Sequence, residues 1–316
     1  MRGRLFTCGG KGYDLPPLLR WEILRTGSVP CDSFSVTFPY DAAMAEALRT
    51  ASEFQALDGA GATVLRAIVD EYQIELGVSG LTAQVNGRGF AARLLDNESR
   101  PMTYQQVTLE ELIRGHVTPY GIRTDAAADL RSTIPYTVAA GTSEWKVLEG
   151  FCRTRGGFTP GFTAEGRLLA VPEGEGGRRL RLEAGTAVLS CVVREDRYGV
   201  FSEVLVIDKT RNVSYTVENP EAKQLGRQCR RVLYTPGQST WDAMRYTGEY
   251  QIRRSREEEK TVTLRLAGNF PAQPGDTVEA ELPMMGIKGV YRAAEVRSMF
   301  SPNQGETSVL ILKERG

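Results

Sequence analysis

The sequence predicts a β-rich α+β protein with a small mixed α/β unit in its middle third. Alternating apolar residues dominate about the first 90 positions and return after position 177, whereas helical periodicity governs the stretch between them. Hydrophobic residues make up 41% and charged residues 25% of the 316 positions, which is the balance of a folded globular chain. That length favours two or three compact units.

A β-meander is predicted over the first third of the chain. The segment 33–38 places Phe34, Val36 and Phe38 on one face, as in a half-buried strand. An Ala-, Met- and Leu-rich composition from 41 to 57 favours a short helix near its start. The predicted elements are strands at 33–38, 63–76 and 81–85, a helix at 41–50, and turns at 58–61 and 77–80.

The middle third predicts two helices. Thr108 and Glu111 have the spacing of a capping box, so a helix is expected to run from there to about Gly115. A second helix is predicted over 143–154, because its apolar residues recur at spacings of three and four on one face: Trp145, Leu148, Phe151 and Cys152. Extended segments at 134–138 and a hairpin at 162–171, turning at Glu165-Gly166, complete a mixed α/β unit.

The last third predicts strands again, after a Gly- and Glu-rich linker at 172–177. A turn at 195–199 is expected to join two of these strands as a hairpin, and no internal repeat of fixed period is visible. The predicted strands are 178–182, 187–194, 200–208, 261–266, 277–282, 289–296 and 307–313, with a helix at 239–254. The predicted domains are 1–92, an N-terminal β-barrel domain; 93–176, the mixed α/β middle domain; and 177–316, a second β domain.

Charge and cysteine content exclude several classes of protein. Lys plus Arg and Asp plus Glu both number 39, so no net charge would recruit nucleic acid or an anionic membrane. Five cysteines, an odd number without a C-x-x-C pair, fit neither a disulfide framework nor a zinc ribbon, and indicate synthesis in a reducing cytoplasm. No apolar run is long enough for a membrane span, and no signal-peptide core is present.

No catalytic, cofactor-binding or metal-binding residues are predicted, and we expect the protein not to be an enzyme. His116 is the only histidine, which rules out a His-based triad or a multi-His metal site within one chain. His116 is expected at the C-terminal end of the helix that starts at Thr108, where it would have a structural role. The doublets Asp70-Glu71 and Glu110-Glu111 diverge on a strand or helix, and no glycine cluster has the spacing of a phosphate loop.

A family resemblance lies in the stretch 85–121, VNGRGFAARLLDNESRPMTYQQVTLEELIRGHVTPYG. It resembles the baseplate hub proteins of contractile phage tails and phage-derived bacteriocins, of the Mu-like hub or late control D type. The structural signature is Gly87 and Arg88, followed by Leu94, Leu95 and Asp96. Gly87 would allow a tight exit from a strand, Arg88 would fork onto a carboxylate or backbone carbonyls, and Asp96 would end the next turn. The alternative is that the Arg88 side chain is exposed to solvent and makes no such contact.

The resemblance extends over most of the chain. PCDSFSVTFPYD and AIVDEYQIE are similar to the first barrel of such hubs, YTVAAGTSEWKVLEGFC to the middle domain, and YTGEYQIRRSREEEKTVTLRLAG to the last domain. It implies two antiparallel, tail-tube-like β-barrels, possibly assembled from discontinuous segments, and a homotrimer that adapts the hexameric tail tube to a trimeric spike. The implied partners are other copies of the chain, the tube, the spike and other baseplate proteins. The implied location is the particle baseplate, after synthesis in the bacterial cytoplasm.

One alternative remains open from the residues alone. YTVAAGTSEWKVLEGFC also resembles the start of a LysM-type unit, in which a strand and a Gly-containing turn precede a helix. That reading implies a peptidoglycan-binding or cell-wall-degrading tail protein. Trp145 or Trp241 would then be the stacking platform for a sugar ring.

Overall fold

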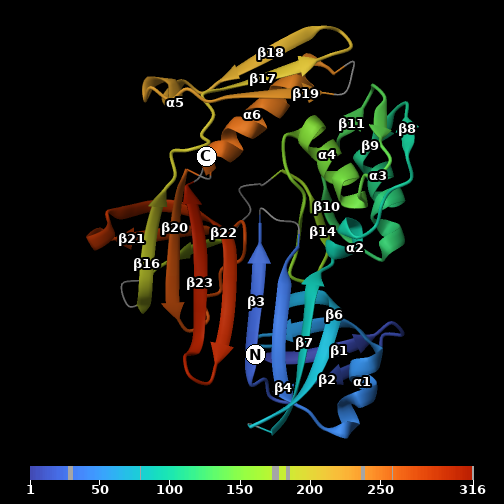
Figure 1. Cartoon of the computed structure of the whole chain (residues 1–316), viewed down its shortest axis with the longest axis vertical. Helices are drawn as coiled ribbons and strands as arrows, with labels where there is room; N and C mark the ends of the chain where they lie inside the picture. Colours follow the sequence, from blue (N-terminus) through green and yellow to red (C-terminus); the bar gives the residue numbers. More distant parts are fainter. Residues whose placement is uncertain are drawn as a thin grey trace.

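One long, mainly antiparallel sheet organises the protein (Figure 1). The computed structural model describes residues 1–27, 31–78, 80–172, 178–182, 186–235, 239–257 and 259–314. Within these ranges, the main path of the sheet has the order β16-β20-β23-β22-β3-β4-β7-β6-β5-β1-β2, and β21 and β15 branch from β22. The prediction of a β-rich fold with antiparallel sheet is confirmed.

The first half-sheet comprises β1 to β7. Its strands are β1 (Arg2–Thr7), β2 (Gly12–Asp14), β3 (Arg20–Thr26), β4 (Ser33–Pro39), β5 (Ala51–Leu57), β6 (Thr63–Gly77) and β7 (Gly80–Gly89). Asp41 caps the short helix η1 (Ala42–Met44), which continues directly into α1 (Ala45–Thr50), and the helix predicted at 41–50 is confirmed. The helical composition continues to Leu57, yet this stretch is a strand because Phe54 and Ala56 alternate into the core.

The second half-sheet comprises β15, β16 and β20 to β23. Its strands are β15 (Arg179–Arg181), β16 (Val188–Glu195), β20 (Lys260–Ala267), β21 (Thr277–Leu282), β22 (Ile287–Ser301) and β23 (Gly305–Glu314), with η3 (Pro283–Met285) between β21 and β22. β22 runs antiparallel beside β3, so this one strand pair joins the two half-sheets (Figure 1).

The middle unit packs α3 against α4 over a separate apolar core. Thr108 caps α3 in a complete capping box and Ser143 caps α4, so both predicted helices are confirmed. The core includes Leu112, Leu148 and Phe151. The helices are α2 (Ala92–Leu95), α3 (Leu109–His116), η2 (Thr118–Tyr120) and α4 (Glu144–Gly156). The strands are β8 (Met102–Tyr104), β9 (Val107–Thr108), β10 (Thr124–Ala127), β11 (Arg131–Ser132), β12 (Tyr136–Val138), β13 (Gly161–Phe162) and β14 (Leu168–Ala170), the last two forming the predicted hairpin.

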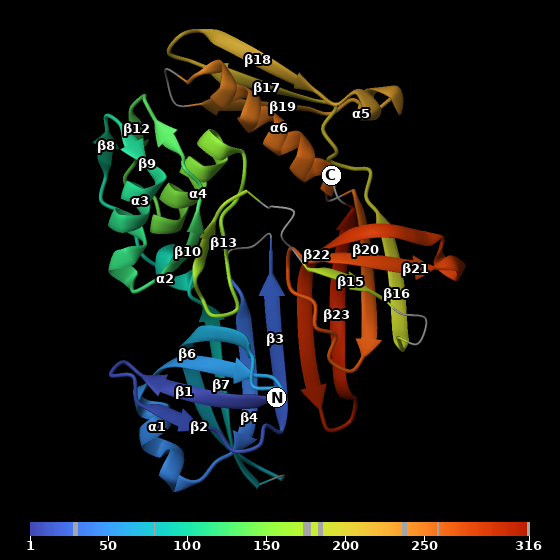
Figure 2. The ribbon, with the colours of Figure 1, turned by 180° about the vertical axis from the view of Figure 1, so that it is seen from behind.

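A fourth unit, β17 to α6, interrupts the second half-sheet (Figure 2). It comprises β17 (Glu203–Asp208), β18 (Val213–Glu218), α5 (Pro220–Gln224), β19 (Arg230–Thr235) and α6 (Trp241–Glu257). The predicted hairpin between 187–194 and 200–208 is wrong, because β16 pairs with β20 whereas β17 pairs with β18 and β19. Val204 and Val206 pack on α6, so burying them draws β17 away from β16.

The predicted linker at 172–177 lies outside the described residues from position 173 onward.

Four separate apolar cores are present in the described residues. They lie in the first half-sheet, the middle unit, the second half-sheet and the β17–α6 unit. The three predicted domain ranges remain predictions. No helix in the described ranges combines the length and apolarity that a bilayer crossing needs.

The two half-sheets repeat one strand arrangement. In each, a strand of 15 residues, β6 or β22, turns through a hairpin into a strand of 10 residues, β7 or β23. A β-bulge interrupts both hairpins at the same place, between Val69 and Glu71 in β6 and between Ala293 and Glu295 in β22. β5 and β21 pair with the first half of the long strand in equivalent register.

The repeat extends to the strands on the other side of each hairpin. β4 and β20 pair with β7 and β23, and the same alternation buries Phe34, Val36 and Phe38 in β4 and Val262, Leu264 and Leu266 in β20. β3 then pairs with β4, and β16 pairs with β20 in the same way. The sequence hides this repeat because the β17–α6 unit separates β16 from β20, whereas β3 and β4 are near neighbours in the chain.

Candidate functional site

Gly87 lies inside β7, opposite Phe34 of β4, rather than at the strand exit that the sequence suggested. A Cβ atom on Gly87 would lie 1.9 Å from the carbonyl oxygen of Ile68 and 2.6 Å from the Phe34 ring. Only glycine fits between them. The first half-sheet therefore depends on Gly87 for packing.

Arg88 forks between two carboxylates from different elements. Its guanidinium donates to Asp70 in β6, at 2.7 and 3.0 Å, and to Asp96 at the C-terminal end of α2, at 3.1 and 2.8 Å. The hydrogen bonds from Arg88 lower the pKa of Asp96. Leu94 is fully buried in the middle core, and Leu95 packs against it. The five residues of the predicted signature thus lie in the first half-sheet, in the middle unit and between them, and their role as a family signature stays a prediction.

His116 ends α3, as predicted, and sits in a buried polar cluster. Its Nδ1 lies 2.6 Å from a carboxylate oxygen of Glu144, at the start of α4, and its Nε2 lies 2.9 Å from the Tyr104 hydroxyl. Tyr120 donates to the other oxygen of Glu144 at 2.9 Å. The cluster ties the end of α3 to the beginning of α4. The sequence missed Glu144, whose burial depends on two helices packing together.

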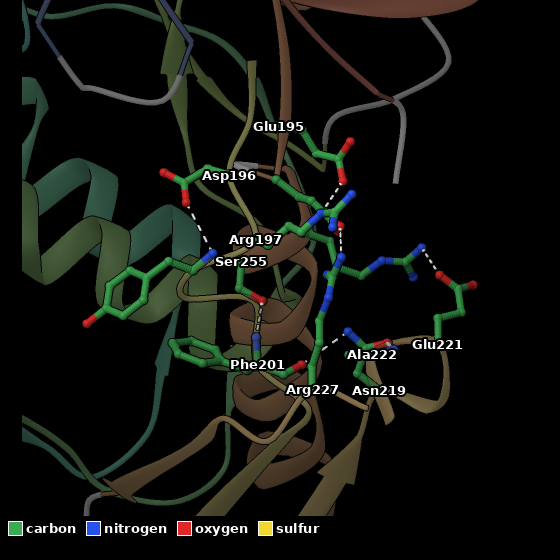
Figure 3. Close-up of polar contacts among 12 residues, drawn as sticks. Glu195, Asp196, Arg197, Phe201, Asn219, Glu221, Ala222, Arg227 and Ser255 are labelled. Atoms are coloured by element: carbon green, nitrogen blue, oxygen red, sulfur yellow. Dashed lines mark hydrogen bonds and ion pairs between the residues drawn. The ribbon is translucent and has the colours of Figure 1, made fainter. Parts of the chain in front are cut away.

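A polar cavity of about 290 Å³ lies where α5, the C-terminal half of α6 and the start of β20 meet. Around it, Arg227 donates to Glu259 at 2.6 Å and Arg256 to Glu221 at 2.5 Å (Figure 3). The Ser255 hydroxyl accepts a hydrogen bond from the backbone N–H of Phe201. Each charged side chain that lines this cavity has a partner of opposite charge, with Arg197 and Arg292 outside the lining pairing with Glu195 and Glu257. This arrangement favours joining the β17–α6 unit to the sheet over binding a charged ligand.

A reactive cysteine, a metal-binding cluster or a tryptophan that could stack on a sugar would each indicate a functional site among the described residues. Burial raises the pKa of Cys31 to about 11 and that of Cys152 to about 12, which disfavours the thiolate form at neutral pH. The described chain contains no cluster of three or more His, Cys, Asp or Glu side chains arranged for a metal ion. Trp145 is buried, so the sugar-stacking role considered for it is wrong. Trp241 is half exposed and packs edge-on against Tyr215.

The LysM-type alternative also lacks its second helix. After β12 and α4 the chain enters β13 and β14 directly, and β14 pairs with β10. The strand–helix–helix–strand order of a LysM unit is therefore not present between residues 136 and 170, all of which the structure describes.

Two unpaired strand edges are the features that most resemble a functional surface. β16 ends the sheet and pairs only with β20 in the described chain, whereas its counterpart β3 lies between β4 and β22. The second half of β6, from Asp70 to Gly77, pairs only with β7 among the described strands, whereas the matching half of β22 also pairs with β3. In the first half-sheet the open edge is the second half of β6, whereas β3 covers the matching edge of β22. In the second half-sheet the open edge is that of β16, whereas β22 covers the matching edge of β3.

Apolar side chains gather at these open edges. Tyr72, Ile74 and Leu76 follow one another on one face of β6, and Leu76 is 80% exposed. On β16, Leu189 and Val192 are also exposed. Exposed apolar residues along an unpaired strand are characteristic of a protein–protein contact.

Comparison with known proteins identifies the fold. A tail protein from Neisseria meningitidis MC58 matches with a TM-score of 0.78 and 18% identity over 100% of this chain and 97% of its own. The 43 kDa tail protein of prophage MuSo2 from Shewanella oneidensis matches with the same TM-score and identity over 99% and 98%. The protein therefore has the fold of phage tail proteins, and the expected resemblance is confirmed at that level.

A more distant match points in the same direction. An Escherichia coli type VI secretion component, described as structurally similar to the T4 bacteriophage tail proteins gp27 and gp5, matches with a TM-score of 0.60 and 10% identity over 95% of this chain and 74% of its own. No family model matches the sequence, and no curated protein matches it.

Proposed function

We propose that the protein is a structural hub of a contractile tail or related injection particle. In this role three copies form a ring that receives the hexameric tail tube on one side and the trimeric spike on the other. The partners are other copies of the chain, the tube protein, the spike protein and other baseplate proteins, and the working location is the particle baseplate. The role is mechanical and needs no catalytic group.

The internal repeat is the observation that carries the proposal. A chain with two similar half-sheets presents two similar units, so a trimer presents six in a pseudo-sixfold ring. Such a ring matches a sixfold tube while the chain itself keeps threefold symmetry. In the assembled hub, each half-sheet would be the inner part of one tail-tube-like barrel. The tail-protein fold supports this assignment.

The test is the mass of the purified protein by light scattering, with negative-stain images of the same sample. A trimeric ring about as wide as a tail tube is the expected result. A monomer that fails to associate with either purified tube protein or purified spike protein would contradict the proposal.

A further inference from the structure

We propose that the open edge of β6 in one copy pairs, antiparallel, with the open edge of β16 in a second copy, with Leu76 opposite Cys191 of the second copy. This inference rests on the proposed trimer and gives its interface a residue-by-residue register. The sheet would then continue from copy to copy around the ring, leaving neither edge exposed.

The contact within the chain supplies the template. In the junction between half-sheets, β22 pairs with β3 so that Ser298 lies opposite Ile23 and Phe300 opposite Trp21. The repeat places Ile74 and Leu76 of β6 at the positions of Ser298 and Phe300, because both are counted from the same bulge.

The correspondence between the half-sheets also gives the matching positions on β16. Trp21 and Ile23 of β3 lie opposite Val36 and Phe34 of β4. Cys191 and Val193 of β16 lie opposite Leu264 and Val262 of β20, the counterparts of those two residues. Cys191 and Val193 therefore stand where Trp21 and Ile23 stand in the template.

Transferring the template predicts one register. Tyr72, Gln73, Ile74, Glu75 and Leu76 lie opposite Glu195, Arg194, Val193, Val192 and Cys191 of the second copy, in that order. A shift of one residue would turn the apolar face of β6 to the other side of the sheet, so burial selects this register over its neighbours.

Burial explains why the second copy is the fitting occupant. Phe300 crosses the junction and packs against the core of the first half-sheet. In the predicted pairing, Leu76 takes the same place over the second half-sheet core, against which Cys191 and Val193 are already partly packed. Ile74 and Leu76, which a single copy leaves exposed, are thereby covered.

Charge agrees with the same register. In the junction within the chain, Arg297 of β22 reaches diagonally to Glu22 of β3, with 3.4 Å between Nη1 and Oε1. A diagonal of the same direction, two residues earlier along β6, joins Glu71 to Arg194 of the second copy. Glu71 and Arg194 therefore meet with opposite charges on one face of the joined strands, while Ile74 and Leu76 meet Val193 and Cys191 on the other.

Cross-linking through the native thiol tests the register. Cα atoms opposite each other in an antiparallel pair are about 4.5–5.5 Å apart, within the range that a disulfide spans. The full-length variant L76C, oxidised with copper phenanthroline at high protein concentration, is expected to give a covalent trimer on a non-reducing gel. Each chain would link to one neighbour through its new thiol and to the other through Cys191.

Two matched variants make the result specific. L76C/C191S should give no linked trimer, which identifies the native partner thiol. I74C lies on the same face of the same strand but diagonal to Cys191 of the second copy, at about 7–8 Å, so it should link far more slowly.

The outcomes separate the interface from the hub proposal. If light scattering finds a trimer and L76C gives no link, the pairing is overturned and the hub proposal stands. If I74C links at least as fast as L76C, the register is overturned. If the protein stays monomeric, with and without tube or spike protein, and L76C gives no link, both proposals fall.

Discussion

The two half-sheets have the same strand arrangement but differ in what covers their outer strands. β3 of the first half-sheet is covered on both edges, and its Trp21 and Ile23 are buried. β16 of the second half-sheet has one neighbour in the described chain, and the matching residues Cys191 and Val193 are only partly buried. Burial at these positions is therefore set by the neighbouring strand as well as by the apolar pattern, which both strands carry.

The largest difference in unfolding free energy between β3 and β16 is expected from substitutions at Arg25 and its counterpart. Arg25 in β3 is buried, donates to Asp32 at 2.8 Å and also donates to the backbone carbonyl of Val64 at 2.9 Å. Arg25→Met leaves the Asp32 carboxyl without this partner and should reduce the free energy of unfolding by about 3–5 kcal/mol. The measurement is urea unfolding of the full chain.

The matched control is the counterpart of Arg25 in β16. Glu195 is exposed and pairs with exposed Arg197, so Glu195→Gln should change the free energy of unfolding by less than about 0.5 kcal/mol. Equal effects at the two positions would show that edge coverage does not distinguish the two strands.

The next contrast concerns side-chain volume in the hairpins. Gly87 faces Phe34 in the first half-sheet, whereas Leu312 faces Val262 at the equivalent position in the second. Gly87→Leu should lower the free energy of unfolding by about 3 kcal/mol, because the added Cβ meets the Ile68 carbonyl oxygen.

Adding Phe34→Val to that variant identifies the cause. This second change relieves the ring contact but not the contact with the Ile68 backbone, so stability should not return to the wild-type value. Full recovery in thermal or urea unfolding would assign the effect to the Phe34 ring instead.

A charge placed at matching positions of β22 and β6 is expected to have different effects on the stability of the single chain. Ser298 is buried in the junction within the chain, so Ser298→Asp should cost about 2 kcal/mol of unfolding free energy. Ile74→Asp, at the matching exposed position of β6, should leave the stability of the single chain within about 0.5 kcal/mol while abolishing trimer formation. An Ile74→Asp protein that still forms a trimer by light scattering would exclude this face from the interface.

The smallest effect is expected at the bulge of β6. The bulge residue Asp70 is held by Arg88, whereas the bulge residue of β22 is the uncharged Ala294. Arg88→Gln should lower the unfolding free energy by about 1 kcal/mol at neutral pH, since the ion pairs it removes are partly exposed.

The pH dependence of the Arg88 effect follows from its partner. Arg88 lowers the pKa of Asp96 in the folded protein. The ionised carboxylate therefore stabilises the fold above the ordinary Asp pKa of about 3.9, and this contribution is lost as the pH falls through the lowered folded value. Urea unfolding of wild type and Arg88→Gln should differ most at neutral pH and converge as the pH falls through the lowered pKa of Asp96. A difference that persists in acid would assign the effect to packing of the Arg88 side chain.

Local sequence patterns predict most of the individual helices and strands of this protein. The period-two pattern of 33–38, the capping box at Thr108 and the apolar stripe containing Trp145 each specify an element through contacts within a few residues, and all three are confirmed. The resemblance around Gly87 and Arg88 likewise indicated the tail-protein fold without coordinates.

Tertiary structure alone decided which strands become neighbours. β16 pairs with β20 across the whole β17–α6 unit, and β22 pairs with β3 from the opposite end of the chain. A strand's own pattern shows which face is apolar but does not name the strand beside it, because any antiparallel partner satisfies the same backbone hydrogen bonds. The repeat, the paired edge of β22 and the open edge of β6 follow from those long-range pairings.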